Sequence, residues 1–281
     1  MQKKIDKAKA FLAENRQLFR CPICHKSFVQ ESYTLKCEEN HQFDLSKKGT
    51  LYFLKSHNQS EYNHEMFSHR QVMIKSGMYR KMLEKLIPFV QEKENIIDIG
   101  CGEGSFLTEL THLGMSGTKI GFDLSKDGIY LASNQPIEAF WCAADLTNLP
   151  FADQSADCLL NIFSPSHYAE FQRVLKPNGL VVKIVPETGY LRELREAFFP
   201  NNQAKQSYSN EKVIEKFSQS LAVVADERIT SVFEIPQKKR LDLLEMSPLE
   251  WQADPKIKEV LKQNPLEKVT IDLRMLVGRV R

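Results

Sequence analysis

The chain has 281 residues, a net charge of +2 and 42% hydrophobic residues, all ordinary values for a globular protein with one large domain or two. No apolar run approaches the ~18 residues that a membrane helix needs, and the first residues lack the apolar stretch of a secretory signal, so we expect a cytoplasmic protein. Residues 1–60 carry eleven Lys and Arg against six Asp and Glu. A basic front end could bind RNA, although a solvated lysine-rich helix would give the same count.

Residues 1–19 alternate lysines with apolar residues and predict an amphipathic helix. The next residues follow the pattern C-x2-C-x12-C-x3-H, in which Cys21 and Cys24 form one chelating pair and Cys37 and His41 the other. A redox Cys-x-x-Cys or buried free thiols would leave the second pair unexplained. The spacing therefore predicts a structural zinc ion with four protein ligands, which stabilises a module too small to bury much core.

Aromatic and basic residues are interleaved around the four predicted ligands. Such residues stack bases and pair with phosphates in RNA-binding modules, but they also form small cores with a solvated rim. We therefore predict that residues 1–60 form a basic helix and a zinc-binding RNA-recognition module. The polar residues 56–64 then link this module to a second domain over residues 65–281.

Residues 65–91 open the second domain with apolar residues at helical spacing, interrupted at Gly77. They predict a pair of helices that covers one side of a ligand cleft. Tyr79, just after the break, is placed to close over a ligand, or it is an ordinary core tyrosine.

The sequence that follows predicts a strand, a tight turn and the start of a helix. A run of β-branched residues ends in Asp98, and Gly100, Gly102 and Gly104 come next at alternate positions. Glycine permits positive φ and lets a ligand approach the bare backbone. The acid would repel the pyrophosphate of a dinucleotide but suits an ammonium group. We expect a cationic amino-acid ligand such as S-adenosylmethionine, although such glycine strings also occur in ordinary turns.

Two further strands end in acids. Asp123 comes at the place where doubly wound folds bind ribose hydroxyls, and Asp145, followed by Leu146, could accept a hydrogen bond from an adenine amine. Each acid alone could be a helix cap. Together with Asp98 they predict three carboxylates along the carboxyl edge of one parallel sheet, which favours a ligand site.

Residues 156–163 and 180–185 predict a fourth and a fifth strand, and residues 229–235 and 269–280 a final antiparallel pair. Helical stretches separate the parallel strands. The order predicts an α/β fold with a doubly wound, mostly parallel, seven-stranded sheet and a small zinc module in front of it.

Four features, in this order, resemble one family: the Cys and His quartet, residues 70–79, the turn at residues 98–104 and residues 186–194. They are similar to the bacterial 23S rRNA (guanine-N1)-methyltransferases, which have a class I S-adenosylmethionine-dependent, Rossmann-like domain. Members methylate a guanine in the hairpin 35 loop near the macrolide and tylosin site. The resemblance covers nearly the whole chain after Arg20, but only in outline towards the carboxyl end.

The resemblance implies that Tyr79, the glycine turn and the pair Phe106 and Leu107 line the cofactor, and that the four ligands hold zinc. In the family a histidine stands at the place of Tyr190, so this sequence departs from the pattern there; a tyrosine can still donate one hydrogen bond to the methionyl end. The resemblance also implies 23S rRNA as the partner and a possible homodimer.

Methylation of guanine N1 requires a base, because this nitrogen bears a proton in the usual keto form. The end of the fourth predicted strand supplies candidates: Asn161 and Ser164 could bind the base edge, and His167 could take the proton or be an exposed helix cap. The guanine must be unpaired or flipped out. Two alternatives remain at this stage, a small-molecule methyltransferase and a zinc-stabilised RNA-binding protein without catalysis.

Overall fold

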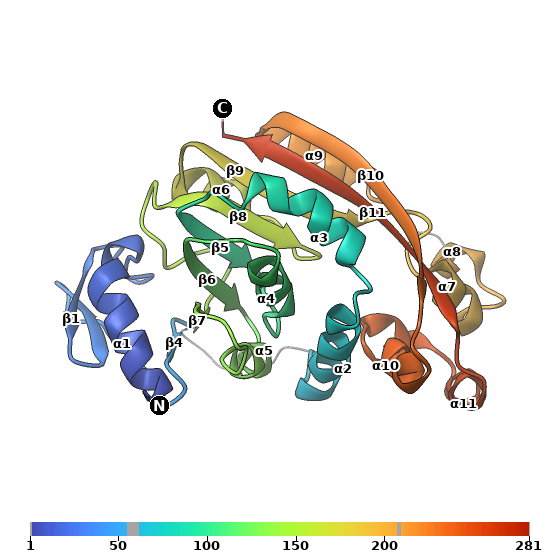
Figure 1. The fold of residues 1–281 in the computed structure, drawn as a ribbon. Helices are drawn as coiled ribbons and strands as arrows, with labels where there is room; N and C mark the ends of the chain where they lie inside the picture. The colour runs from blue at the N-terminus through green and yellow to red at the C-terminus, as the bar shows by residue number, and fades with distance from the viewer. Residues whose placement is uncertain (1, 55–61, 207–208, 281) are drawn as a thin grey trace.

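The computed structural model describes residues 2–54, 62–206 and 209–280. An eight-stranded sheet runs through the molecule in the order β10-β11-β9-β8-β5-β6-β7-β4 (Figure 1). Neighbours from β4 to β9 are parallel, whereas β11 is antiparallel to both β9 and β10. The strands are β4 (Thr50–Tyr52), β5 (Asn95–Ile99), β6 (Thr118–Asp123), β7 (Phe140–Ala143), β8 (Ala156–Ile162), β9 (Leu175–Pro186), β10 (Ala222–Glu234) and β11 (Lys268–Arg279).

This topology confirms the predicted doubly wound, mostly parallel α/β sheet, with one difference. The sequence predicts seven strands, and the structure adds β4 at the edge, paired in parallel with β7. The central strands are nearly continuous aliphatic runs, because helices cover both of their faces. Strand β4 is only three residues long, so it carries almost no pattern of its own.

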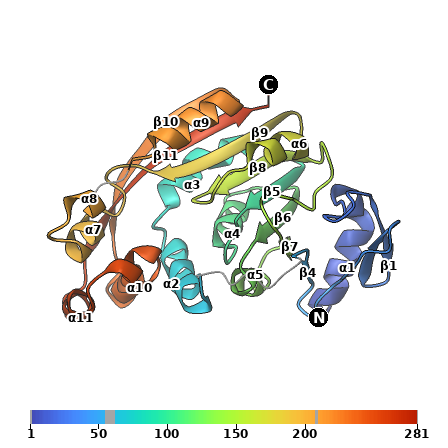
Figure 2. The same ribbon diagram turned by 180° about the vertical axis from the view of Figure 1, so that it is seen from behind.

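Helices cover both faces of the sheet. Helices α3 and α4 lie on the face turned to the viewer in Figure 1, and α6 and α9 lie on the opposite face, seen in Figure 2. The predicted helix pair is α2 and α3, separated around Gly77, whose φ is +91°. The helices are α1 (Lys4–Asn15), α2 (His64–Lys75), α3 (Arg80–Leu86), α4 (Ser105–His112), α5 (Lys126–Ala132), α6 (Tyr168–Val174), α7 (Arg192–Phe198), α8 (Gln203–Gln206), α9 (Glu211–Ser220), α10 (Arg240–Glu245) and α11 (Pro255–Gln263). None of the helices in the described ranges has the length and apolar character that a bilayer crossing requires.

The zinc module consists of α1 and a three-stranded antiparallel sheet, β1 (Phe28–Glu31), β2 (Thr34–Cys37) and β3 (Gln42–Asp44). It shares a core with the large sheet: the ring of Phe140 in β7 stacks on Phe11 at 4.9 Å and meets Phe19 edge-on at 5.5 Å. The module and the sheet are therefore packed together through aromatic side chains. Residues 56–61 of the predicted linker lie outside the described residues.

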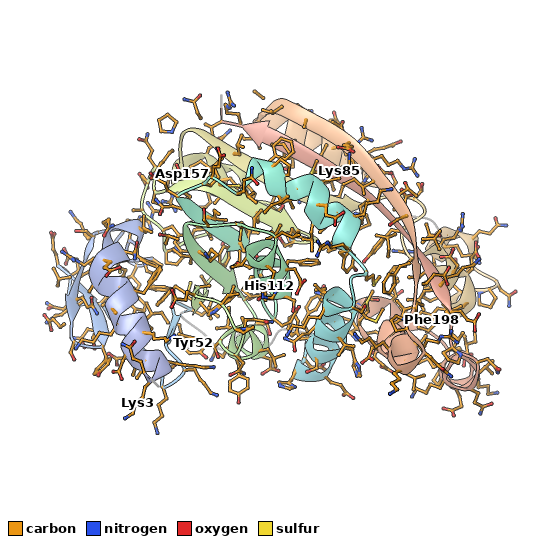
Figure 3. All side chains as sticks on the ribbon, in the orientation of Figure 1. Lys3, Tyr52, Lys85, His112, Asp157 and Phe198 are labelled. Atoms are coloured by element: carbon orange, nitrogen blue, oxygen red, sulfur yellow. The ribbon has the colours of Figure 1, made fainter. Side chains whose placement is uncertain are left out.

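At the other end of the molecule, α7, α8, α10 and α11 gather beside α2. Lys3 and Phe198 mark the two ends in Figure 3. His69 in α2 forms a 2.8 Å ion pair with Asp242 in α10, and Arg70 donates to the carbonyl of Met246. The long strands β10 and β11 thus bring the carboxyl-terminal helices to the end of the sheet at which the candidate site lies.

Candidate functional site

Four side chains around the β1-β2-β3 sheet converge on one point. The ligand atoms of the predicted quartet all lie within 4.8 Å of one another; Cys37 Sγ is 3.4 Å from Cys24 Sγ and 3.3 Å from His41 Nδ1, and Cys21 Sγ is 3.6 Å from the same nitrogen. Tetrahedral zinc with ~2.3 Å bonds to sulfur places two sulfurs about 3.8 Å apart. The donor set and its spacing fit a structural zinc ion with no open position.

The predicted glycine turn follows β5 at the carboxyl edge of the sheet. Gly100, Gly102 and Gly104 have φ angles of +67°, +54° and +79°, which side-chain-bearing residues rarely adopt. A Cβ added to Gly102 would lie 3.0 Å from the ring of Phe67 in α2, and one added to Gly100 would lie 2.7 Å from Ser164. Side chains from two other segments therefore cover the turn, and a ligand seated on Gly102 would take the place of the Phe67 ring.

Asp98 supplies the strongest sign of a cationic ligand. Its side chain is 2% exposed, and its Oδ2 has no hydrogen-bond partner among the described residues. Burial, with the carboxylates of Asp123 and Glu103, raises the pKa of Asp98 to about 8. A buried carboxyl with an unused oxygen gains most from a cation placed next to it. These residues fit the ammonium group of S-adenosylmethionine.

The other two predicted acids, Asp123 and Asp145, have different surroundings in the structure. Asp123 braces the turn, since its Oδ2 accepts from the amide of Gly102 at 2.8 Å and its Oδ1 from that of Ser125 at 2.7 Å. Asp145 is exposed and accepts from both the amide and the hydroxyl of Thr147. Both acids lie at strand ends on the carboxyl edge as predicted, with Leu146 half-buried beside Asp145. Their contacts with ribose and adenine stay predictions.

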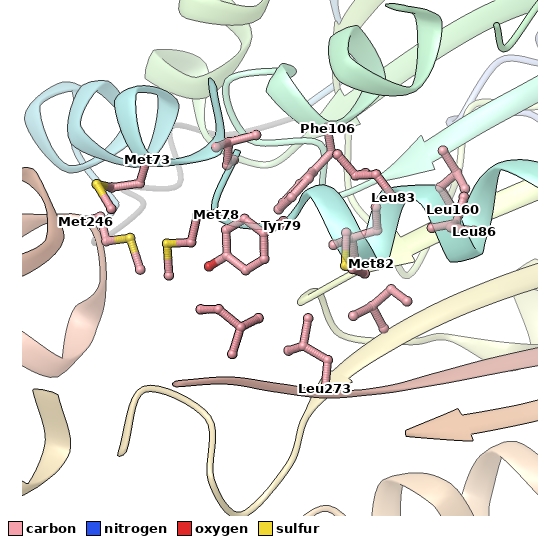
Figure 4. Close-up of a cluster of buried hydrophobic side chains, with 14 of the residues drawn as sticks. Met73, Met78, Tyr79, Met82, Leu83, Leu86, Phe106, Leu160, Met246 and Leu273 are labelled. Carbon is pink, nitrogen blue, oxygen red and sulfur yellow. The ribbon is translucent and has the colours of Figure 1, made fainter. Parts of the chain in front are cut away.

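An aromatic cluster lies beside the turn. Tyr79 contacts Phe106 and Phe163, with ring centroids 5.3 and 5.5 Å apart, and its hydroxyl lies 2.6 Å from that of Tyr190. Figure 4 shows Tyr79 among buried methionines and next to Phe106. Leu107, also predicted to line the cofactor, is fully buried. Its side chain packs in the core, and its contact with the cofactor, which would have to come through the backbone amide in the first turn of α4, stays a prediction.

Two cavities flank this cluster and share Tyr62, Phe163 and Pro186. The first, of about 490 Å³, is lined by Arg70, Tyr79, Phe106, Tyr190 and residues from α7 and the loop after α10. Arg70 also acts on the acids of the glycine turn. Burial raises the pKa values of Glu103 and Asp123, and the positive charge of Arg70 lowers them. The second, of about 560 Å³, lies beyond Phe163 at the ends of β8 and β9.

The loop after β8 is held by a closed hydrogen-bond network. Asn161 donates to Ser164 Oγ at 2.6 Å and to the Pro165 carbonyl at 2.8 Å, while its Oδ1 accepts from Ser166 and Lys183. Ser164 Oγ donates in turn to the carbonyl of Ile99. The amide of Asn161 has no capacity left for a base edge in this arrangement. Binding of the base by Asn161 and Ser164 stays a prediction that requires one of these bonds to open.

His167 is the N-cap of α6, and its Nδ1 accepts from the amide of Glu170 at 3.3 Å. This is the helix-cap alternative foreseen from the sequence. Its role as the base stays a prediction. Nε2 would have to accept the proton, because Nδ1 is used in the helix cap.

Sequence reasoning assigned no role to Arg70, Phe163 or Lys183. Arg70 lies on α2, where the sequence reasoning considered only the apolar residues that define the helix. Phe163 has a φ of +56°, unusual for a bulky residue, and backbone strain of this kind is invisible in a sequence. Lys183 left a usable signal, because it is the one charge within the aliphatic run at residues 180–185.

The contact between Tyr79 and Tyr190 yields a prediction. Burial raises the pKa of both phenols, so both are neutral and one donates to the other. We expect Tyr190→Phe to raise the KM for S-adenosylmethionine about fivefold with little change in kcat, because Tyr79 loses its partner. Tyr190→His should keep the KM near that of the parent, because imidazole can still hydrogen-bond. Tyr33→Phe, on the zinc module, is the control; equal KM values for all variants would contradict the assignment.

Comparisons with known proteins agree with this geometry. A family model described as a methyltransferase domain matches residues 97–183, and a zinc-ribbon model described as "RlmA, N-terminal" matches residues 19–59. The chain is 36% identical to YxjB of Bacillus subtilis strain 168, over 93% of this chain and 96% of the relative. YxjB carries the provisional name 23S rRNA (guanine-N1)-methyltransferase.

A second relative is the 23S rRNA (guanine(748)-N1)-methyltransferase of Streptomyces fradiae, 24% identical over 92% of this chain and 96% of its own length. Among solved structures, a chain from the complex of the Haloferax volcanii Trm112 methyltransferase activator with a methyltransferase superposes with a TM-score of 0.50. It is 19% identical and covers 78% of this chain and 97% of its own. At that identity the likeness concerns the fold alone.

Proposed function

Since the chain belongs to the bacterial 23S rRNA (guanine-N1)-methyltransferase family, we propose that it transfers the methyl group of S-adenosylmethionine to N1 of a guanine in the hairpin 35 loop of 23S rRNA. The observation that carries the proposal is the buried carboxylate of Asp98 at the head of the glycine turn, whose Oδ2 finds no partner in the part of the chain that the structure describes. S-adenosylmethionine, when bound, supplies an electrophilic methyl group on a cationic sulfur. The protein has mainly to position and desolvate the two reactants.

We assign the chain's own residues as follows. Asp98 would hold the ammonium group, and the amides of the turn and of the first turn of α4 would hold the carboxylate end. The aromatic faces of Tyr79, Phe106 and Phe163 would surround the sulfonium, because a cation is attracted to the face of an aromatic ring. The same rings exclude water from the reacting centre.

The zinc module is the proposed RNA-recognition element. Exposed tyrosines on it and on the neighbouring α5 each lie under a lysine: Lys9 is 4.9 Å from the ring centroid of Tyr33, and Lys48 is 4.9 Å from that of Tyr130. Such pairs offer a ring for stacking and a charge for phosphate. A small-molecule methyltransferase would have no use for them. The homodimer implied by the resemblance stays a prediction, and the reaction would take place in the cytoplasm with rRNA.

The proposal is tested by incubating the protein with S-adenosylmethionine carrying a labelled methyl group and unmodified 23S rRNA fragments that contain hairpin 35. We expect label in N1-methylguanosine after digestion, and none when the loop guanines are replaced by adenines. Label only in small molecules would favour a metabolite methyltransferase. RNA bound tightly without label would favour a non-catalytic RNA-binding protein.

A further inference from the structure

The second cavity has a lining without carboxylates. It opens between the loop after β8, the end of β9 and α9, and about 560 Å³ is enough for a nucleobase and part of its sugar. Three lysines line it, together with Tyr168, whose buried hydroxyl has no hydrogen-bond partner among the described residues. Donors and positive charge suit a ligand with acceptor atoms and a phosphate. The lining lysines are Lys183, Lys212 and Lys216.

Lys183 differs from the other two because it is buried. It lies near the carboxyl end of β9 and is 3% exposed, whereas Lys212 and Lys216 on α9 are exposed to solvent. Its Nζ donates to Asn161 Oδ1 and to the Ser164 carbonyl, the latter at 3.1 Å. Both acceptors are neutral, and Lys183 forms no ion pair with a carboxylate within the described ranges. An ammonium ion in this place is therefore poorly compensated.

The protonation state of Lys183 follows from these surroundings. Burial lowers the pKa of Lys183 to about 8. The other titratable groups that line the cavity are the two α9 lysines and the phenols of Tyr62 and Tyr168, and there is no carboxylate among them to raise it again. A substantial fraction of Lys183 is thus a neutral amine near physiological pH. In that form its two N–H bonds satisfy Asn161 and Ser164, and a lone pair remains.

We propose that this cavity receives the target guanine and that Lys183, rather than His167, which does not line the cavity, is the base that removes its N1 proton. The inference rests on the proposed function and goes beyond it by naming the acceptor pocket and the proton acceptor. As the N1–H bond breaks, the proton passes to Lys183 Nζ; the electron pair left on N1 forms the new N–C bond, and the pair of the broken S–C bond returns to sulfur. Lys212 and Lys216 would pair with the flanking phosphates. Asn161 is then a positioning residue, which fixes the direction of the amine through its Oδ1.

The test compares three variants of Lys183 with a matched control, in single-turnover methylation of the hairpin 35 fragment as a function of pH. Lys183→Met removes the amine, Lys183→Arg keeps a charge and the donors but accepts no proton, and Lys183→Ala leaves room for an added amine. The control is Lys119→Met in β6. Lys119 is another buried strand lysine, but its Nζ donates to the Gly117 carbonyl and it lines neither cavity. Binding of RNA and of S-adenosylmethionine is measured in parallel.

We expect Lys183→Met and Lys183→Arg to slow methyl transfer by about 10²- to 10⁴-fold with RNA and cofactor affinities nearly unchanged. Small primary amines should partly restore Lys183→Ala. The parent rate should rise with pH and level off above about pH 8, because only the neutral amine accepts a proton. Lys119→Met should keep the parent rate.

A parent-like rate for Lys183→Arg would overturn the proposal, because a permanent cation would then suffice. A parent-like rate for Lys183→Met, or no rescue of a folded Lys183→Ala by amines, would also overturn it. If Lys183→Met does not fold, Lys183→Arg and the parent pH profile decide. A parent enzyme that fails to methylate guanine N1 at all would instead refute the proposed function, so the two failures are distinguishable.

Discussion

We expect Asp98→Asn to weaken binding of S-adenosylmethionine by about 10²-fold or more, because the ammonium group would lose a buried carboxylate whose Oδ2 has no hydrogen-bond partner among the described residues. Calorimetric titration of the free protein measures this directly. The affinity of the parent should rise as the pH approaches 8, since Asp98 must ionise to bind a cation. In Asp98→Asn this pH dependence should disappear.

The same substitution should stabilise the protein without ligand. In the folded chain Asp98 has a pKa of about 8, against 3.8 for an unperturbed group, so between these values the folded chain holds a proton that the unfolded chain has lost. The free energy of unfolding therefore falls as the pH rises through this window, by up to ~1.4 kcal/mol per pH unit. Asparagine removes the effect and should raise the melting temperature at pH 8.

Asp127→Asn, an exposed acid in the first turn of α5, is the matched control and should change neither quantity. Unchanged cofactor affinity in Asp98→Asn would refute the ammonium assignment. That result would not affect the assignments of the metal site and of the RNA-binding surface, which do not depend on Asp98.

Removing one zinc ligand should have the second large effect. We expect Cys24→Ser to abolish the binding of one zinc per chain and to lower the melting temperature by about 10 °C, because structural zinc contributes several kcal/mol to folding. The loss should extend beyond the module, since its aromatic core is continuous with β7. Metal content by mass spectrometry and a thermal melt measure the two results, and rRNA methylation should fall with them.

Cys158→Ala provides the comparison, because this thiol is buried in β8 away from the quartet. It should lose some stability as a small core substitution but retain zinc. His41→Cys should retain zinc as well, with four thiolates. A zinc-free Cys24→Ser with unaltered melting and turnover would show that the module neither supports the sheet nor selects the RNA.

Local sequence signals predicted the parts of the site that depend on spacing. The zinc quartet could be predicted because chelation requires close pairs of ligands. The turn from Asp98 to Gly104 could be predicted because a positive φ restricts the residue type. The parallel strands could be predicted from their runs of aliphatic residues. These features lie within short segments, and each carries its own physical constraint.

Features that depend on contacts between distant segments could not be predicted. Phe67 covers Gly102 because α2 packs against α4 and α5 on one side and against α10, far along the chain, on the other. Asn161 was expected to face the base, but its partners come from the following loop and from Lys183 on the next strand. Strand β4 pairs with β7, which follows it after more than eighty residues, and three residues give no periodicity to detect.

The position of β11 has a consequence for synthesis of the protein. This strand follows both β9 and β10 in the sequence, yet it lies between them in the sheet, bonded to β9 on one side and to β10 on the other. Until the ribosome has made β11, the edge of β9 is open and β10 has no neighbour, so the nascent chain exposes unpaired backbone. A premature stop before residue 268 would leave that edge open for good, and the truncated product should aggregate rather than persist as a shortened enzyme.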